Sequence, residues 1–221
     1  MSNALIQLLV LAGVAIFLIL RLKAVLGSRE GFEKPPVQVP DQETAAAPRR
    51  GFEVIEGGPD RDIADHVPET SPAFHALAAM KQAEPGFSVA EFLKGAGGAY
   101  EMILIAFETG KLDPVKPFLS PEVRDSFEAA VAERAARGLT TEATFLGLRE
   151  LALQDAEFDP ASRLGEVTVR MTGELVTATR DAGGELVDGD PKASRRQRDV
   201  WTFARTMGAE DPNWQLVATG E

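Results

Sequence analysis

The longest apolar stretch of the chain lies near its N-terminal end. Residues Ala4 to Leu20 read ALIQLLVLAGVAIFLIL, in which Gln7 is the single polar side chain. As a helix, this stretch would span roughly 26 Å, close to the hydrocarbon core of a bilayer, which is about 30 Å thick. The pattern therefore predicts a transmembrane helix, within an anchor region over residues 1–26.

Two other interpretations of this stretch fit less well. A secretory signal peptide has basic residues before its apolar core and small residues at its cleavage site. Here Met1–Asn3 carries no basic side chain, and Arg21 and Lys23 stand where small residues would be. A core helix would have a polar face. Because the basic residues follow the stretch, we expect the remaining chain to face the cytoplasm, with Arg21 and Lys23 as a membrane collar.

The next segment has no apolar periodicity. Residues 27–70 are rich in Pro, Gly, Ala and acidic residues. Such a composition buries too little apolar surface to offset the entropy that ordering would cost. We therefore expect a disordered tether with an r.m.s. reach of about 35–40 Å, which would let a domain over residues 71–221 sample a partner near its anchor.

A first helix of this domain is predicted over residues 72–83. Ser71 is a suitable N-cap, and Pro72 fits the first helical position. Phe74 and Leu77 share its apolar face, which could dock on the domain or lie on lipid. The polar face is not strongly basic, and this favours docking.

A longer helix is predicted over residues 88–109. Ser88 and Glu91 form a capping box, and Phe87 and Phe92 form a hydrophobic staple. The apolar face of this helix is wide enough to pack against a sheet.

Three glycines interrupt this helix. Gly95, Gly97 and Gly98 each cost about 1 kcal/mol of helix stability relative to alanine. Their clustering indicates either close approach of another element or room for a ligand.

A further helix begins at Ser120–Pro121 and runs to Arg137.

Alternation of apolar and polar residues after Thr140 predicts four strands. They cover residues 143–158, 164–181, 197–207 and 213–219, and Gly173 is expected to mark a bulge. Helices followed by antiparallel strands are typical of an α+β fold, with a curved four-stranded sheet around the long helix. Two sets of residues are each expected to share one face of a strand: Trp201, Phe203 and Met207, and then Trp214, Leu216 and Ala218.

Composition and charge add expectations about compartment and partners. A length of 221 residues suits one domain with an anchor and a tether, and the absence of cysteine fits a reducing compartment. A net charge of −11 argues against nucleic acid as a partner. The acidic domain should be held near the anionic leaflet by its tether and not by its charge.

Few residues suited to catalysis lie in the domain. His66 and His75 both precede residue 87, and no stretch matches a phosphate-binding or dinucleotide-binding motif. Tyr100 could act as an acid in a pocket, but a tyrosine on an apolar helix face is more typical of a core. We predict no enzymatic activity, no cofactor and no metal site.

One basic cluster lies in or beside a predicted hairpin. It comprises Lys192, Arg195, Arg196 and Arg198. A solvated turn is the simpler interpretation, and a contact site for an acidic partner is the alternative. Arg195, Arg196 and Arg198 are the partner-contact candidates.

The order of motifs resembles a known family. The matching stretches are Ser71–Phe74, Phe92–Phe107, Gly110–Val123, Asp199–Arg205 and Asp211–Thr219, of which the last two are the most specific. Together they resemble the bacterial Tim-forty-four-like family, the TimA-type proteins of alphaproteobacteria. A mitochondrial relative of this family tethers the chaperone motor to the inner-membrane import channel. The resemblance covers about residues 70–221.

This resemblance implies a nuclear-transport-factor-two-like fold, in which a curved sheet and helices enclose an apolar pocket. It also implies an adaptor without catalysis. The chaperone-recruiting activity does not carry over, because residues 27–70 show no kinship to the region responsible. The family's core positions correspond to Phe92, Tyr100, Phe107, Trp201, Phe203 and Trp214, and Ala96 and Ile103 join them on the helix face as pocket or core candidates.

The favoured function is an adaptor that positions a protein partner at the cytoplasmic face of the bacterial inner membrane. Its anchor would contact the membrane lipids, and the protein partner is unidentified. The alternative is a module that binds a lipid or a small apolar ligand in the sheet–helix pocket. An enzyme is a third hypothesis, and it would need a polar cluster inside the pocket.

Overall fold

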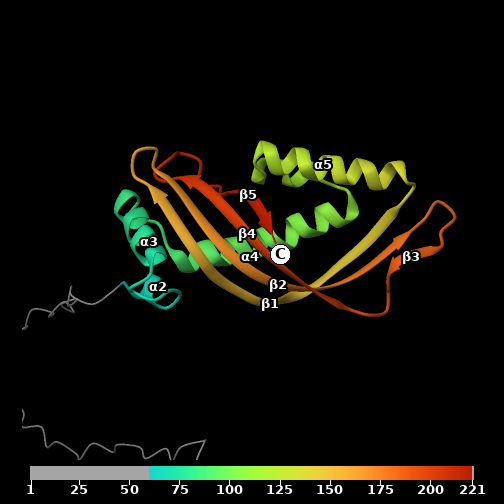
Figure 1. The fold of residues 1–221 in the computed structure, drawn as a ribbon, viewed down its shortest axis with the longest axis horizontal. Helices are drawn as coiled ribbons and strands as arrows, with labels where there is room; N and C mark the ends of the chain where they lie inside the picture. Colours follow the sequence, from blue (N-terminus) through green and yellow to red (C-terminus); the bar gives the residue numbers. More distant parts are fainter. Residues whose placement is uncertain (1–59, 221) are drawn as a thin grey trace, which may run out of the picture. The chain divides into compact units, whose positions relative to one another are not determined.

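The computed structural model describes residues 60–220 (Figure 1). The expected anchor over residues 1–26, with Arg21 and Lys23, and the expected tether up to residue 59 lie outside the described residues. No helix within residues 60–220 is both long enough and apolar enough to cross a bilayer.

Helices come first in the described chain, and strands follow them. The helices are α2 (Arg61–Ala64), α3 (Pro72–Ala83), α4 (Val89–Thr109), the 3-10 helix η1 (Asp113–Phe118) and α5 (Pro121–Ala136). The strands are β1 (Thr140–Asp159), β2 (Leu164–Arg180), β3 (Leu186–Gly189), β4 (Arg195–Thr206) and β5 (Gln215–Gly220). The predicted α+β class is confirmed.

The strands form one antiparallel sheet in the order β1-β2-β4-β5. The four predicted strands are all present, but the prediction of a four-stranded sheet is wrong because β3 also pairs with β2. The four residues of β3 are exposed, so they leave no alternating apolar pattern that could have predicted this strand.

The sheet curves, and α4 lies along its concave side (Figure 1). Side chains of α4 and of the inner sheet face form one hydrophobic core. The α4 residues in this core are Val89, Phe92, Leu93, Ala96, Tyr100, Ile103, Leu104 and Ala106.

Strand β1 carries three irregularities. Its register against β2 shifts between Phe145 and Gly147, between Leu148 and Glu150, and between Leu153 and Asp155, so each time one extra residue lies on β1. The expectation of a bulge at Gly173 is therefore wrong, because the bulge opposite it is on β1. Gly173 instead leaves room for the ring of Tyr100, since a Cβ there would lie 2.9 Å from that ring.

The expected boundary between tether and domain, at residue 70, lies too far toward the C-terminus. Residues 60–70 were expected to be disordered, but Ile63 is fully buried and Val67 is 6% exposed in the core. These two apolar residues lie in a segment rich in charged residues, and their tertiary packing outweighs its composition.

Helix α3 docks on the domain. Leu77 and Met80 are fully buried, so the docking alternative holds for residues 72–83. The ammonium of Lys81 lies 2.7 Å from carboxylate oxygens of both Asp60 and Asp62, and so ties α3 to the segment around α2.

The start of α4 is capped by two side chains. The Ser88 hydroxyl accepts from the Glu91 N–H, as the capping box predicts, but the Glu91 carboxylate lies near Lys94 instead of returning to Ser88. The rings of Phe87 and Phe92 lie 6.5 Å apart and form the expected staple. The second cap is Asp62, whose carboxylate accepts from the first two N–H groups of the helix, at Val89 and Ala90.

Burial of Asp62 would by itself raise its pKa, but this effect is outweighed. Hydrogen bonds from Lys81 and from the N–H groups of Ala90 and Val89 lower the pKa of Asp62 to about 2. Asp62 is therefore charged at neutral pH, and its negative charge interacts favourably with the positive, N-terminal end of the α4 dipole.

The face predictions hold for β4 and fail in part for β5. Trp201, Phe203 and Met207 are all buried, as expected. In β5, Leu216 is buried but Ala218 is exposed, because the register against β4 skips one residue at this point and reverses the alternation.

Candidate binding pocket

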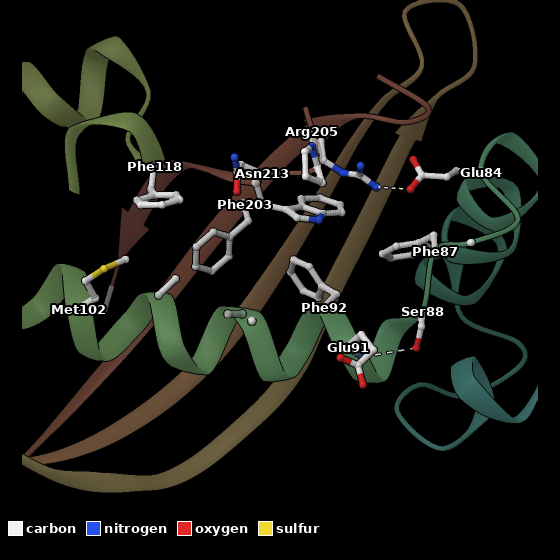
Figure 2. A pocket seen from close by; sticks show the side chains of 16 residues that line it. Glu84, Phe87, Ser88, Glu91, Phe92, Met102, Phe118, Phe203, Arg205 and Asn213 are labelled. Carbon is white, nitrogen blue, oxygen red and sulfur yellow. Dashed lines mark hydrogen bonds and ion pairs between the residues drawn. The ribbon is translucent and has the colours of Figure 1, made fainter. Parts of the chain in front are cut away.

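A half-open cavity of about 490 Å³ lies beside the N-terminal half of α4 (Figure 2). Its walls come from the α3–α4 connection, α4, η1, β4 and the loop before β5. The lining residues are Glu84, Gly86, Phe87, Ser88, Glu91, Phe92, Gly95, Ala96, Ala99, Met102, Phe118, Phe203, Arg205, Pro212, Asn213 and Trp214.

Aromatic side chains form the centre of this pocket. The centroid of the Phe92 ring lies 4.7 Å from that of Trp214 and 6.1 Å from that of Phe203, and both pairs are arranged edge to face. Phe87 lies 5.9 Å from Trp214. Such contacts fix the rings. Phe87, Phe92 and Phe203 are buried, and Trp214 is half-buried.

The glycines of α4 leave one side of the helix open. A Cβ at Gly95 or Gly98 would meet no atom within 4 Å, so these glycines do not serve a close approach within the described residues. Gly95 lines the pocket, and Gly98 lines a neighbouring apolar cavity that shares Met102 with it. Gly97 differs, because a Cβ there would lie 3.5 Å from Leu148 and 3.6 Å from Leu151 of β1. Close approach of another element therefore holds for Gly97, and open space beside the helix holds for Gly95 and Gly98.

Arg205 is the one buried cation of the pocket wall. Arg205 follows Trp201 and Phe203 at spacings of two along β4, so its side chain lies on the same, core-facing side of the sheet. Of this side chain's surface, 8% is exposed. Its guanidinium lies 5.3 Å from the ring of Trp214, and one of its terminal nitrogens donates to Glu84 at 2.8 Å. Figure 2 shows Arg205 and Glu84 at the end near Phe87, opposite Met102.

The Glu84 carboxylate is held in its charged form. Burial would raise its pKa, but the hydrogen bonds from Arg205 and from the Gly208 N–H outweigh this and lower the pKa. Of the buried side-chain nitrogen and oxygen atoms in residues 60–220, Nε of Arg205 is without a hydrogen-bond partner. This unpartnered donor is enclosed in the protein beside the apolar centre of the pocket.

The predicted pocket or core residues divide between two cavities. Four of them, Phe92, Ala96, Phe203 and Trp214, line the pocket described above. Three others, Ile103, Phe107 and Trp201, line a second cavity of about 290 Å³ that α5 also borders through Phe127. Tyr100 is fully buried.

Tyr100 belongs to a buried polar contact. Its hydroxyl donates to the Asp199 carboxylate at 2.6 Å, and the Gln197 amide donates to the other carboxylate oxygen at 3.3 Å. Burial raises the pKa of Tyr100, and the hydrogen bond to Asp199 raises it further. A phenol in this state is neutral and holds α4 against β4.

The three arginine candidates do not share a face. Arg195 donates to Glu108 of α4 at 3.0 Å, on the helix side of the sheet. Arg196 and Arg198 alternate with it along β4 and therefore project from the opposite face. These arginines do not form one contact patch in the described structure.

Several pocket residues were missed by sequence reasoning. Glu84, Met102 and Phe118 come from segments whose convergence only the tertiary fold reveals. Arg205 did leave a signal, because its spacing of two from Phe203 places it on the apolar face of β4.

Within residues 60–220, no group of three or more His, Cys, Asp or Glu side chains could hold a metal ion.

Comparison with known proteins identifies the family. Curated proteins give no match. Among solved structures, the intermembrane space region of the chloroplast protein ARC6 is similar, with 16% sequence identity and a TM-score of 0.39 over 59% of this chain and 92% of that chain. The model of the Tim44-like domain family matches residues 74–221, which is most of the chain, and this confirms the resemblance. The chain therefore belongs to the Tim44-like domain family.

Proposed function

We propose that this protein is a non-enzymatic, membrane-anchored adaptor that positions a partner protein at the cytoplasmic face of the bacterial inner membrane. The domain supplies the partner-binding surface, and the N-terminal region supplies the attachment. In this proposal residues 1–26 form the anchor and collar, and residues 27–59 form the tether.

The observation that carries the proposal is the composition of the pocket. It has an apolar, aromatic centre and a rim of polar groups that includes Ser88, Glu91 and Asn213. Protein interfaces have this arrangement, in which buried aromatic residues supply the binding energy and a polar rim excludes water. Membership of the Tim44-like family supports the same function.

Proximity labelling in cells tests this function. A labelling enzyme fused to the C-terminus should mark cytoplasmic proteins and recover one or more partners at high yield. Met102→Glu, which places a charge in the pocket, should lower that recovery, whereas Leu146→Glu on exposed β1 should leave it unchanged. Labelling confined to the other side of the membrane would contradict the proposal.

Attachment is a separate part of the proposal. After carbonate washing of membranes, the full chain should remain in the pellet, and a chain lacking residues 1–26 should move to the supernatant. Release of the full chain would remove the anchor from the proposal.

A second candidate function is binding of a lipid or a small apolar ligand. The cavity volume of about 490 Å³ and its aromatic lining favour this candidate, since small-molecule sites have similar sizes and linings. Native mass spectrometry of the purified full chain should then show a bound species that Met102→Glu removes. An empty pocket in every preparation would exclude it.

A further inference from the structure

We propose that the convex face of the sheet binds the convex face of a second copy of this chain, with the acidic end of each face on the arginine end of the other. The acidic end is formed by Asp155, Glu157 and Glu166, and the arginine end by Arg196 and Arg198. This contact is separate from the pocket described above, which lies on the concave side of the sheet.

The convex face is accessible in the described part of the chain. Trp201 and Phe203 lie in the core, so Val200 and Thr202, which alternate with them along β4, face the convex side. In Figure 1, α4 and α5 lie on the concave side. On the convex side Arg170 keeps 51% of its side chain exposed. This face is therefore available to another molecule.

The acidic end holds like charges close together. Glu157 of β1 and Glu166 of β2 are directly opposite each other in the strand register, and Asp155 is opposite Thr168 beside them. Like charges at opposed positions on one face destabilise a sheet. Among residues 60–220, no Lys, Arg or His nitrogen lies within 4 Å of these three carboxylates. A cationic partner would relieve this repulsion.

The arginine end has the opposite imbalance. Arg198 is opposite Thr172 of β2, and Arg196 is opposite Glu174. The carboxylate of Glu174 is already bound by the guanidinium of Arg149. Within the described chain, no carboxylate lies within 4 Å of Arg196 or Arg198. Both guanidinium groups are exposed and can bind carboxylates of another molecule.

The two ends are spaced so that a two-fold axis can exchange them. Along β2, six residues separate Glu166 from Thr172, the position opposite Arg198, which is about 20 Å of strand. An axis that runs across the strands midway between the two ends places each acidic end on the partner's arginine end. In such a symmetric contact every interaction is made twice.

The strip between the two ends permits close approach. It consists largely of small, half-buried side chains, which are Ala152, Thr168, Val200 and Thr202. Arg170 also lies there, but two of its nitrogens donate to one oxygen of Glu150 at 3.1 and 2.9 Å, so this pair adds no net charge. Two sheets can therefore pack at the usual separation of about 10 Å.

This arrangement selects a second copy as the occupant. A uniformly basic partner would match the acidic end and be repelled by the arginine end, and an acidic partner would have the reverse fault. A second copy carries both charges on the same face at the same spacing, so it satisfies both ends at once.

Cysteine cross-linking tests the contact on the full chain in dodecyl maltoside. The chain has no cysteine, so a single introduced thiol reports one position. Ala152→Cys, in the central strip, should give a covalent dimer with a short bis-maleimide. Ser126→Cys is the matched control, because Ser126 is exposed on α5, away from the convex face, and it should give little dimer.

Charge reversal decides between this contact and an unspecific one. Glu166→Arg and Arg198→Glu, each in the Ala152→Cys background, should weaken association at least about tenfold, as measured from the dependence of cross-linking on protein concentration. A mixture of the two variants with different tags should form the mixed dimer as well as the parent does, because opposite charges then meet at both ends. Circular dichroism verifies that each variant is folded.

Three outcomes would overturn the inference. Cross-linking of Ala152→Cys no stronger than that of Ser126→Cys would exclude the contact, and so would a mixture that does not restore the dimer. Protection of the cysteine at position 152 from a monofunctional maleimide, without cross-linking, would mean that another segment of the chain covers this face. The adaptor function would stand in each case, because its proposed binding surface is on the concave side.

Discussion

At the residue scale, two polar pairs in the described core join side chains to specific partners. Tyr100 with Asp199 and Arg205 with Glu84 are two such pairs, each joining residues far apart in the sequence. Because a buried polar group without its partner is costly, each pair favours one packing of α4 and α3 on the sheet.

Titration of Tyr100 gives a first prediction. Its pKa is raised in the folded state, whereas in the unfolded chain it ionises near its usual value of about 10. The unfolded state therefore loses a proton first, and stability should fall as the pH rises above about 10. Tyr100 is the sole tyrosine, so the phenolate absorbance should appear only together with unfolding. A phenolate signal at pH 10 in folded protein would contradict this.

Replacing Tyr100 by phenylalanine gives a second prediction. The Asp199 carboxylate would lose the hydrogen bond from the phenol, and the free energy of unfolding should drop by about 1.5–3 kcal/mol. Denaturation by urea at pH 7 measures the change. A loss much smaller than 1 kcal/mol would mean that solvent replaces the phenol at Asp199.

Two glycines with different surroundings give a third prediction, in which the two substitutions have opposite effects on stability. Gly173→Ala should destabilise the protein by about 1–3 kcal/mol, because the new Cβ would lie 2.9 Å from the Tyr100 ring and 3.0 Å from Phe145. Gly98→Ala should stabilise it by about 0.5–1 kcal/mol, because the helix gains propensity and nothing lies within 4 Å. Thermal unfolding of both variants compares them, and equal shifts would contradict the assigned role of Gly173.

At the scale of elements, α4 depends on a cap that is distant in sequence. Asp62→Asn should lower the free energy of unfolding at pH 7 by about 1–2 kcal/mol, because the charge at the α4 N-terminus and the pair with Lys81 are lost. The pKa of Asp62 is about 2 in the folded state and near 3.8 when unperturbed. The wild-type contribution is therefore present above about pH 4 and lost as the pH falls toward 2.

Urea denaturation at pH 7 and pH 3 checks this account of Asp62. The difference in stability between wild type and Asp62→Asn should be smaller at pH 3. A difference that does not change with pH would show that packing and not charge explains the effect.

Local sequence signals predicted the helices and strands well, but they could not predict contacts between residues far apart in the sequence. Ser88, Phe87 and Phe92 define the start of α4 within a few residues, so the sequence alone predicted this helix. Asp62 caps the same helix from 27 residues away, and no local pattern encodes that contact. Ala218 was misplaced because a register shift between β4 and β5 breaks the alternation on which the prediction relied.

The pocket was partly predictable for the same reason. Apolar periodicity selected Phe92 and Ala96 on the helix and Phe203 on the strand, and all three line it. Arg205 obeys the same alternation as Phe203, but a charged residue is normally assigned to the solvent face. Its partner Glu84 lies 121 residues away, and the pairing that makes its burial possible exists only in the folded chain.

At the scale of the whole molecule, the boundary of the domain gives a further prediction. A chain that starts at residue 71 lacks Ile63, Val67 and the Asp62 cap, so it should be about 3–6 kcal/mol less stable than one that starts at residue 60. Thermal and urea unfolding of both shortened chains measure the difference. Equal stability would mean that residues 60–70 add nothing to the core.

The three bulges of β1 affect whether neighbouring copies of the domain associate through the edges of their sheets. β1 stands at the end of the strand order, so among the described residues one side of its backbone pairs with no strand. A straight free edge of 20 residues would invite a neighbouring copy to add its own strand and begin aggregation. The bulges interrupt the regular spacing that such pairing needs, and removing one should therefore favour oligomers.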